Sequence, residues 1–441
     1  MPKRKKNLTV IKQDTAGIDI GSKKIFIGIE GMPVKSFDTF TSSFQNTIEY
    51  LKENKIKSVA MESTGVYWIT LYDMFEQAGF EVCLVKSNAA KNIPGRKTDV
   101  KDCQWIQQLY SYGLLKSSFI PPNNIRILRS YTTLRRKNIQ LASDHIRRAQ
   151  KALDLMNIKL HFVISDIQGA SGMRILNDIL QGEHDPNKLV LLCDKQILKN
   201  KRQKVIESLN GNYREEHLFA LKQAVEAYQY YQTKILECDK EIEKQLISMT
   251  KDLPEPESIS KPKPIRRNKP NIENLHTMLM KLTKGVDPSK ITGITDATHL
   301  EIISKVGLDL SKWNTSRHFS AWTGLAPNQN DSGDRKRNKK VKNKSSAGQI
   351  FRIAAHSLTN SKHNALGSFY KRIRAKKGKP FAMKAAARKL AVTYYNIMTK
   401  GIDYVEEGIN LYELKIKEQR IKALHKQARY FGYSLSPVDL S

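Results

Sequence analysis

The spacing of apolar residues in the first 120 positions predicts several short strands. Residues 16–30, AGIDIGSKKIFIGIE, form a strand, a tight turn and a second strand in this interpretation, since β-branched and aromatic residues surround Asp19. Residues 57–63, KSVAMES, predict another apolar strand that ends at Glu62, and residues 81–86, EVCLVK, predict a further one.

Helical spacing lies between these strands. It covers residues 44–56, FQNTIEYLKENKI, and residues 70–80, where Gly79 ends the pattern. Strands that alternate with helices indicate an α/β domain, which we expect over residues 1–122.

After Pro121 and Pro122 the pattern becomes helical and basic, and we expect a helical or coiled-coil region over residues 123–250. Residues 218–246 contain a heptad-like seam in which seven of nine positions are apolar. The seam consists of Leu218, Leu221, Val225, Tyr228, Gln232, Ile235, Asp239, Ile242 and Leu246. An antiparallel helical hairpin and an oligomerisation stalk are both consistent with it.

Residues 251–274 predict a linker rich in Pro and Lys. The stretch 251–270 alone holds five of the fifteen prolines of the chain and has no pattern of a packed element. Beyond it, residues 275–441 predict a third, mainly α-helical and strongly basic region.

Charge points to a polyanionic partner. The 441 residues include 75 Lys and Arg against 43 Asp and Glu, a formal net charge of +32. Such an excess favours nucleic acid, whose phosphates supply most sequence-independent affinity. We find no long apolar span, no amphipathic anchor and no apolar run typical of a signal peptide. The four cysteines include no CxxC pair, which favours a reducing compartment and argues against structural zinc.

Four acidic residues are candidates for a metal site. Asp19 lies within a predicted strand, Glu62 ends another, and Asp99 and Asp102 begin an apolar helix, where residues i and i+3 share one face. If these four carboxylates converge, a divalent cation must compensate their charge, and oxygen ligands suit Mg²⁺ or Mn²⁺. Taken singly, each acid is equally consistent with a turn, a solvated strand end or a helix cap.

A second chemical candidate lies in residues 324–340, GLAPNQNDSGDRKRNKK. The hydroxyl of Ser332 can attack a phosphodiester if another group assists removal of its proton. The sequence Asn-Asp-Ser-Gly is also ordinary turn chemistry, which is the simpler interpretation of these residues taken alone.

Two basic patches are candidate nucleic-acid contacts, although charged runs of this kind are often only solvated loops. One patch belongs to the helices that follow the first domain, and the other belongs to the run RKRNKKVKNK at 335–344. The candidate contacts are Arg135, Arg136, Arg147, Arg148, Arg335, Lys336, Arg337, Lys339 and Lys340.

The motifs GIDIGSKKIFIGIE, AMESTGVYW and RKTDVKDCQWIQQL resemble the N-terminal domain of DEDD transposases of the insertion-sequence 110 group, now understood as bridge-RNA-guided DNA recombinases. The similarity extends over nearly the whole chain. It implies an RNase H-like fold related to the resolvase RuvC, with Asp19, Glu62, Asp99 and Asp102 as the four family acids.

The resemblance also gives Ser332 a role. The C-terminal domain of the family carries Gly-Leu-x-Pro and then Ser-Gly-Gly, whose serine is the nucleophile, and GLAP and Ser332-Gly333 match this pattern. Asp334 replaces the second glycine of this pattern, and a loop that needs a positive φ at this position would disfavour Asp. Ser345 and Ser346 therefore stay as alternatives. The implied mechanism is magnesium-dependent attack on DNA that gives a 5′-phosphoserine linkage and strand exchange through a Holliday-type junction.

The implied partners are donor and target DNA, a structured non-coding guide RNA and further copies of the chain in a dimer or tetramer. A composite site from different protomers and a prokaryotic, nucleoid-associated cytoplasmic location are also implied. The alternatives are a metal-dependent resolvase or nuclease in which water attacks, and a non-catalytic nucleic-acid scaffold. GIDIG also resembles the first phosphate loop of actin-like ATPases, but the chain lacks a convincing second loop of that kind.

Overall fold

The computed structural model describes residues 9–86, 99–327, 331–332, 335–336, 345–361 and 365–436. Within these ranges, the side chains of residues 99–101, 331–332 and 335–336 and of much of the last helix are not described. The chain divides into two compact units, Met1–Ile120 and Pro121–Ser441.

The first unit contains a five-stranded sheet with the order β3-β2-β1-β4-β5. Its strands are β1 (Thr15–Ile20), β2 (Lys24–Ile29), β3 (Lys35–Asp38), β4 (Ser58–Glu62) and β5 (Glu81–Val85). The first three strands pair antiparallel, whereas β4 runs parallel to β1 and β5 parallel to β4. Four of the five strands were predicted. The sequence did not reveal β3 because this edge strand is short and mostly exposed.

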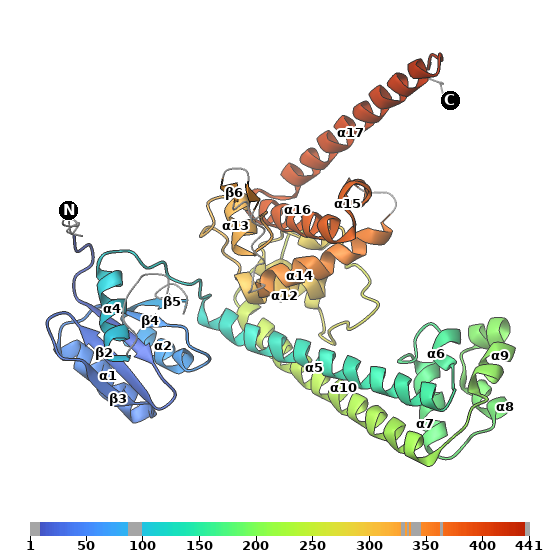
Figure 1. Ribbon diagram of the computed structural model, residues 1–441, viewed down its shortest axis with the longest axis horizontal. Helices are drawn as coiled ribbons and strands as arrows, with labels where there is room; N and C mark the ends of the chain where they lie inside the picture. Colours follow the sequence, from blue (N-terminus) through green and yellow to red (C-terminus); the bar gives the residue numbers. More distant parts are fainter. Residues whose placement is uncertain are drawn as a thin grey trace. The chain divides into compact units, whose positions relative to one another are not determined.

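Helices cover both faces of this sheet (Figure 1). On one face, α1 (Thr41–Glu53) and α2 (Trp68–Gln77) enclose an apolar core that includes Ile18, Met61 and Phe75. On the other face, α4 (Asp99–Ser111) packs through Ile106 and Tyr110 against Ala60 and Val85. The predicted combination of an N-terminal α/β unit with a helical remainder is confirmed.

The second unit begins with a long antiparallel hairpin of α5 (Asn123–Leu155) and α10 (Glu215–Thr250), which lie side by side in Figure 1. Contacts at both ends show the antiparallel direction: His145 stacks on Tyr231, and the amide of Gln245 donates to the carbonyl of Asn124. Of the two interpretations of the heptad seam, the hairpin is therefore the one that this chain adopts. Most seam residues are buried, from Leu221 to Leu246.

Short helices connect the far ends of this hairpin and share its core. They are α6 (Leu160–Val163), α7 (Ala170–Leu180), α8 (Pro186–Leu189), η1 (Val190–Leu192) and α9 (Lys195–Leu209). Their apolar residues pack against α5 and α10, so the connection is a compact cap and not an extended loop.

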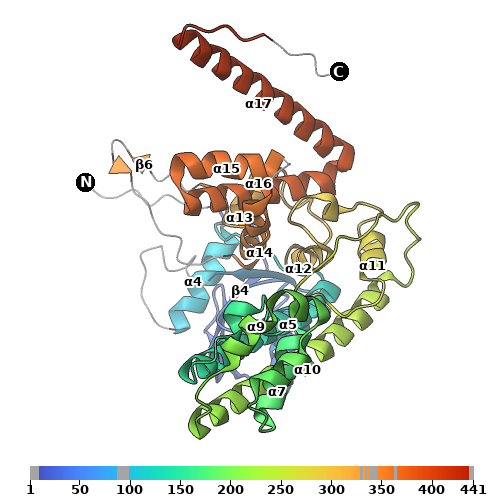
Figure 2. The ribbon, with the colours of Figure 1, turned by 90° about the vertical axis from the view of Figure 1, so that its right-hand side faces the viewer.

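The remaining helices of the second unit follow a segment, residues 251–274, that contains neither helix nor strand. They are α11 (Leu275–Leu282), η2 (Pro288–Lys290), α12 (Asp296–Val306), α13 (Ser316–Trp322), α14 (Ser346–Ala355), η3 (His356–Asn360), α15 (Ala365–Lys377), α16 (Lys379–Lys400) and α17 (Ile402–Tyr430). Figure 2 shows α13, α14, α15 and α16 in one group. Aromatic contacts among Phe319, Phe351, Tyr394 and Tyr395 form its core.

Candidate functional site

The position of α4 on the sheet depends on two glycines. Gly17 of β1 and Gly28 of β2 face each other across the antiparallel pair. A Cβ atom on Gly17 would lie 2.1 Å from the carbonyl oxygen of Cys103, and one on Gly28 would lie 2.8 Å from the backbone nitrogen of Gln104. The backbone of α4 therefore rests directly on both strands, which is possible only because neither residue has a side chain.

The strand register brings two of the predicted acids together. Ile18 pairs with Met61 in the parallel β1–β4 ladder, so the next residues on the two strands are Asp19 and Glu62. Side chains alternate between the faces of a sheet, so Asp19 shares the face of Gly17, against which α4 packs. Asp19 and Glu62 are thus neighbours at the end of that face.

Asp102 reaches the same region from the first turn of α4. Burial is the main reason why the pKa of the adjacent Cys103 thiol is raised to about 11, and the carboxylates of Asp19 and Asp102 both contribute to the increase. Two negative charges from separate elements therefore act on one buried thiol. Its high pKa keeps Cys103 a neutral thiol, which is a poor metal ligand compared with a carboxylate.

Asp99 is the first residue of α4, one helical turn before Asp102, and its side chain lies outside the described residues. Where side chains are described, no group of three or more His, Cys, Asp or Glu is close enough to hold a metal ion. The structure thus makes Asp19 and Glu62 neighbours on the sheet and places Asp102 in the first turn of the helix over the same face, and the described side chains do not complete a ligand set.

Ser332 lies on a minimal β-hairpin in the second unit. Its strand β6 (Asp331–Ser332) pairs antiparallel with β7 (Arg335–Lys336), and Ser332 lies opposite Arg335. Only the backbone of these four residues is described. Arg337, Lys339 and Lys340, predicted to contact nucleic acid, lie outside the described residues.

The alternative nucleophiles Ser345 and Ser346 begin the next helix. Ser345 is the N-cap of α14, and its hydroxyl accepts a hydrogen bond from the backbone N–H of Gly348 at 3.5 Å. This is the usual role of serine at a helix start and explains the residue without catalysis.

The structure corrects the predicted role of Arg135. Its side chain is only 8% exposed, and its Nε donates to Asp239 at 2.5 Å while Nη2 donates to the carbonyl of Asn268. Arg135 therefore has no exposed guanidinium for a phosphate. The sequence misled here because Asp239 lies 104 residues away, at one of the two polar positions of the heptad seam.

The other basic residues of α5 differ in accessibility. Arg136 forms an ion pair with Glu301 at 3.2 Å and is mostly covered. Arg147 and Arg148 are exposed, although Arg147 also pairs with Asp144 on the same helix. Of the predicted α5 contacts, Arg147 and Arg148 are placed where a nucleic acid can reach them.

A buried polar network anchors residues 251–274 and resembles a serine hydrolase triad at first sight. Ser260 Oγ lies 3.2 Å from His276 Nε2, and His276 Nδ1 lies 2.9 Å from Asp296. However, Ser260 donates its single hydroxyl proton to Asp287 at 2.5 Å. In a serine hydrolase the serine hydroxyl donates its proton to the histidine. We therefore interpret the network as structural.

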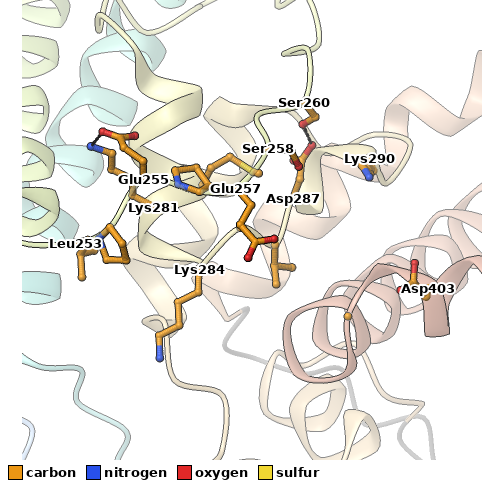
Figure 3. A pocket seen from close by; sticks show the side chains of 16 residues that line it. Leu253, Glu255, Glu257, Ser258, Ser260, Lys281, Lys284, Asp287, Lys290 and Asp403 are labelled. Carbon is orange, nitrogen blue, oxygen red and sulfur yellow. Dashed lines mark hydrogen bonds and ion pairs between the residues drawn. The ribbon is translucent and has the colours of Figure 1, made fainter.

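The same network forms one wall of a pocket of about 750 Å³. Figure 3 shows Ser260 joined to Asp287 and Glu255 paired with Lys281, which lie 2.5 Å apart. Acidic and basic side chains alternate around this pocket, including Glu257 and Lys284. Such a mixed lining lacks the single sign of charge that a polyanion site requires.

One charge feature was missed from the sequence although it is visible there. Between Asp334 and Asp403 the chain contains nineteen Lys and Arg residues and no Asp or Glu. The run at 335–344 is only the beginning of this stretch, which continues through α15 and α16. A count of acids would have extended the candidate interface beyond the obvious basic run.

Comparisons with known proteins identify the family of this chain. A DEDD transposase model of the IS110 type, described as Transposase, matches residues 16–158, and the model of the Transposase IS116/IS110/IS902 family matches residues 289–371. No curated protein matches the chain. None of the described helices is both long and apolar enough to cross a membrane. The first match includes all four predicted acids and the second includes Ser332, and the chain belongs to the IS110 family of DEDD transposases.

Proposed function

We propose that this transposase is an RNA-guided, site-specific DNA recombinase that uses a serine nucleophile and a metal site of four acids. The observation that supports the proposal is the strand register that makes Asp19 and Glu62 neighbours, with Asp102 in the first turn of the helix that packs on the same face.

The proposed fold of the first unit is RNase H-like and related to RuvC. In support, the sheet has the order β3-β2-β1-β4-β5, with antiparallel β1 to β3 and parallel β4 and β5. This arrangement places Asp19 at the centre of the sheet, beside the end of β4.

The donor set fits Mg²⁺ or Mn²⁺, since carboxylate oxygens are the hard ligands that these ions prefer. Asp19, Glu62, Asp99 and Asp102 would hold the ion. When bound, it would neutralise charge on the scissile phosphate and lower the pKa of a coordinated hydroxyl. The four acids would define the geometry of this site. The packing of α4 on Gly17 keeps the first turn of α4, which carries Asp102, close to the sheet.

In the proposed cleavage step, Ser332 Oγ forms a bond to the phosphorus as the P–O3′ bond breaks. The serine hydroxyl loses its proton, and the 3′ oxygen takes up one proton, so the products are a 5′-phosphoserine and a free 3′-hydroxyl. Rejoining reverses these changes on another DNA end, without any external energy source.

Trapping the covalent intermediate tests this mechanism. The purified protein would be incubated with Mg²⁺ and DNA of the element end, then denatured and resolved by electrophoresis. A protein–DNA adduct should form with the natural chain and with Ser345→Ala or Ser346→Ala, and disappear with Ser332→Ala. Asp102→Asn should abolish it, whereas Glu49→Gln, an exposed acid on α1, should not.

The second candidate function is a metal-dependent resolvase or nuclease in which water attacks. The antiparallel pairing of Ser332 with Arg335 favours it, because a place in a β-ladder accounts for this serine without catalysis. DNA cleavage that persists in Ser332→Ala and never yields an adduct would select this alternative.

The proposed guide is a structured non-coding RNA, and the proposed assembly is a homodimer or homotetramer. The net charge of +32 supports a large polyanionic partner. A discrete RNA that copurifies with the protein and resists high salt would support the guide. Light scattering of the RNA-bound protein would measure the number of copies.

A further inference from the structure

A cavity of about 600 Å³ lies in the C-terminal helical group of the second unit. The start of α13, the segment that includes Leu325 and Pro327, and the helical hairpin of α15 and α16 form its walls. Its position is unusual because Pro327 is only five residues before Ser332.

Part of the cavity lining is apolar and includes aromatic rings. It includes Leu325, Phe369, Ile373, Phe381 and Val392. Phe381 is 66% exposed although it lies in the first turn of a well-packed helix. An aromatic ring left open beside other apolar side chains is typical of a binding surface.

Among the described residues that line the cavity, all the charged ones are cationic. They are Arg317, Lys377, Lys384, Arg388 and Lys389. The chain contains no Asp or Glu from residue 335 to residue 402, so this segment adds no negative charge. Repulsion among the cations of the lining favours an anionic occupant.

The helical hairpin explains how rings and cations come together. Gly378, with φ of +80°, joins α15 to α16, and the two helices pack against each other. On α16, residues 381, 384, 385, 388 and 392 share one face, and on α15 residues 369, 373 and 377 share another. Both faces line the cavity, so each contributes apolar contacts and positive charge.

A further cation lies near the Phe369 ring. The guanidinium carbon of Arg372 is 5.8 Å from the centre of the ring. Phe369 thus combines an aromatic surface with a nearby positive charge, two features that single-strand binding sites share.

We propose that this cavity, which we name the α15–α16 pocket, binds an unpaired nucleotide of the DNA strand. The base would stack on Phe369 and Phe381, and its flanking phosphates would contact Lys377, Lys384 and Arg388. The bases of a duplex are already stacked on one another, so their faces are not free to stack on Phe369 and Phe381, and the pocket discriminates for unpaired nucleotides.

The choice of DNA rests on the proposed function of Ser332. The chain passes from the pocket wall at Pro327 to Ser332 within five residues, so a strand held in the pocket is near the nucleophile along the chain. Unpaired bases arise next to a cleavage point during strand exchange, and the pocket would hold them there.

Fluorescence anisotropy with labelled oligonucleotides tests this proposal. Single-stranded DNA, blunt duplex DNA and single-stranded RNA of equal length serve as probes. We expect Phe381→Ala to weaken single-stranded DNA binding about tenfold, the usual effect of losing one stacking ring, and to leave duplex binding unchanged. Phe219→Ala is the matched control, since Phe219 is 65% exposed on α10.

The cations are tested by salt dependence. Lys384→Gln with Arg388→Gln should weaken single-stranded DNA binding and reduce the slope of log K against log salt by about 1.4 for two lost phosphate contacts. A 2-aminopurine base in the probe should show quenching that disappears in Phe381→Ala, and thermal melting of each variant would establish that it is folded.

Several outcomes would overturn the proposal. One is an equal loss of affinity for single-stranded and duplex DNA in Phe381→Ala, and another is no loss of affinity in that variant. A third is a preference for RNA over DNA that depends on Phe381. The result is separable from the mechanism at Ser332. Ser332→Ala should keep its full affinity for single-stranded DNA. If the natural chain binds single-stranded DNA through Phe381 but never forms an adduct, only the serine mechanism is contradicted. If the natural chain forms the adduct and Phe381→Ala binds single-stranded DNA equally well, only the pocket is contradicted.

Discussion

Gly17 and Gly28 lie opposite each other on β1 and β2, and the backbone of α4 packs directly on both. Because α4 begins with Asp99 and carries Asp102 in its first turn, the distance between this helix and the sheet controls how near these acids come to Asp19. Two residues without side chains thus position a candidate metal site to which they contribute no ligand.

Gly17→Ala should therefore impair both folding and activity. The new Cβ would meet backbone atoms of Cys103 and Gln107, which cannot move as a flexible side chain would. We expect a loss of stability at the upper end of the 1–3 kcal/mol that overpacking typically costs, with loss of metal-dependent DNA cleavage. Urea unfolding of the variant measures the first effect. Ser42→Ala, at an exposed position of α1, is the control and should change neither property.

Mg²⁺ should stabilise the protein through Asp19, Glu62 and Asp102. Binding to the folded state alone adds about 2.7 kcal/mol of stability at a concentration one hundred times the Kd, and thermal melting would detect it. Asp102→Asn should melt at a slightly higher temperature without metal, because repulsion is reduced, and should lose the response to Mg²⁺. An equal response in natural protein and Asp102→Asn would contradict the site, and Glu49→Gln should respond like the natural chain.

Arg135→Ala should destabilise the helical hairpin. It would leave Asp239 buried without its charged partner, which costs about 3–5 kcal/mol in comparable sites. Asp239→Ala should have a similar effect, and the double variant should lose less than the sum of the two. Calorimetric melting compares these variants.

Arg148→Ala provides the contrast with Arg135, because its side chain is exposed on the same helix. The free energy of unfolding of Arg148→Ala should differ from that of the natural chain by no more than about 0.5 kcal/mol, while the affinity of this variant for nucleic acid should fall. If Arg135→Ala melts like the natural chain, the buried ion pair is not a significant part of the fold.

Lys305 should make stability rise with pH in the alkaline range. Burial, together with the nearby charges of Arg129 and Arg136, lowers its pKa to about 8, and Nζ donates to Thr133 at 2.5 Å. Below pH 8 the lysine is charged in both states. Between pH 8 and its unfolded pKa near 10.5, only the unfolded state keeps the proton, so folding becomes more favourable as pH rises.

Lys305→Met should accordingly be more stable than the natural chain at pH 7, by about 3 kcal/mol at most, at 1.4 kcal/mol per pKa unit. This advantage should shrink toward pH 10. Melting temperatures from pH 7 to pH 10 measure the difference in stability. Lys151→Met, at an exposed position of α5, is the control. A constant difference between the two proteins at all pH values would contradict the lowered pKa.

Local sequence patterns determined the elements of this fold. Alternating apolar residues predicted β1, β2, β4 and β5, and the heptad spacing predicted the buried face of α10. These predictions succeed because burial on one face imposes a period that neighbouring residues reveal. The short edge strand β3 has no such face and was not predicted.

The order of strand, strand end and helix start also predicted the four acids from the sequence, and Asp19 and Glu62 came together through the register of two strands. Only the tertiary structure showed that Gly17 and Gly28 allow α4 to approach them. A glycine in a strand does not reveal in the sequence which backbone will pack against it, because that partner lies more than seventy residues further along the chain.

The same limit explains Arg135 and the α15–α16 pocket. A charge pattern predicts that a protein binds nucleic acid, but it does not distinguish an arginine paired with a distant aspartate from one that faces solvent. Composition therefore determined the kind of partner, and tertiary structure decided which cations can reach it. The physical reason is that charge is a property of each residue, whereas accessibility depends on contacts between residues far apart in the chain.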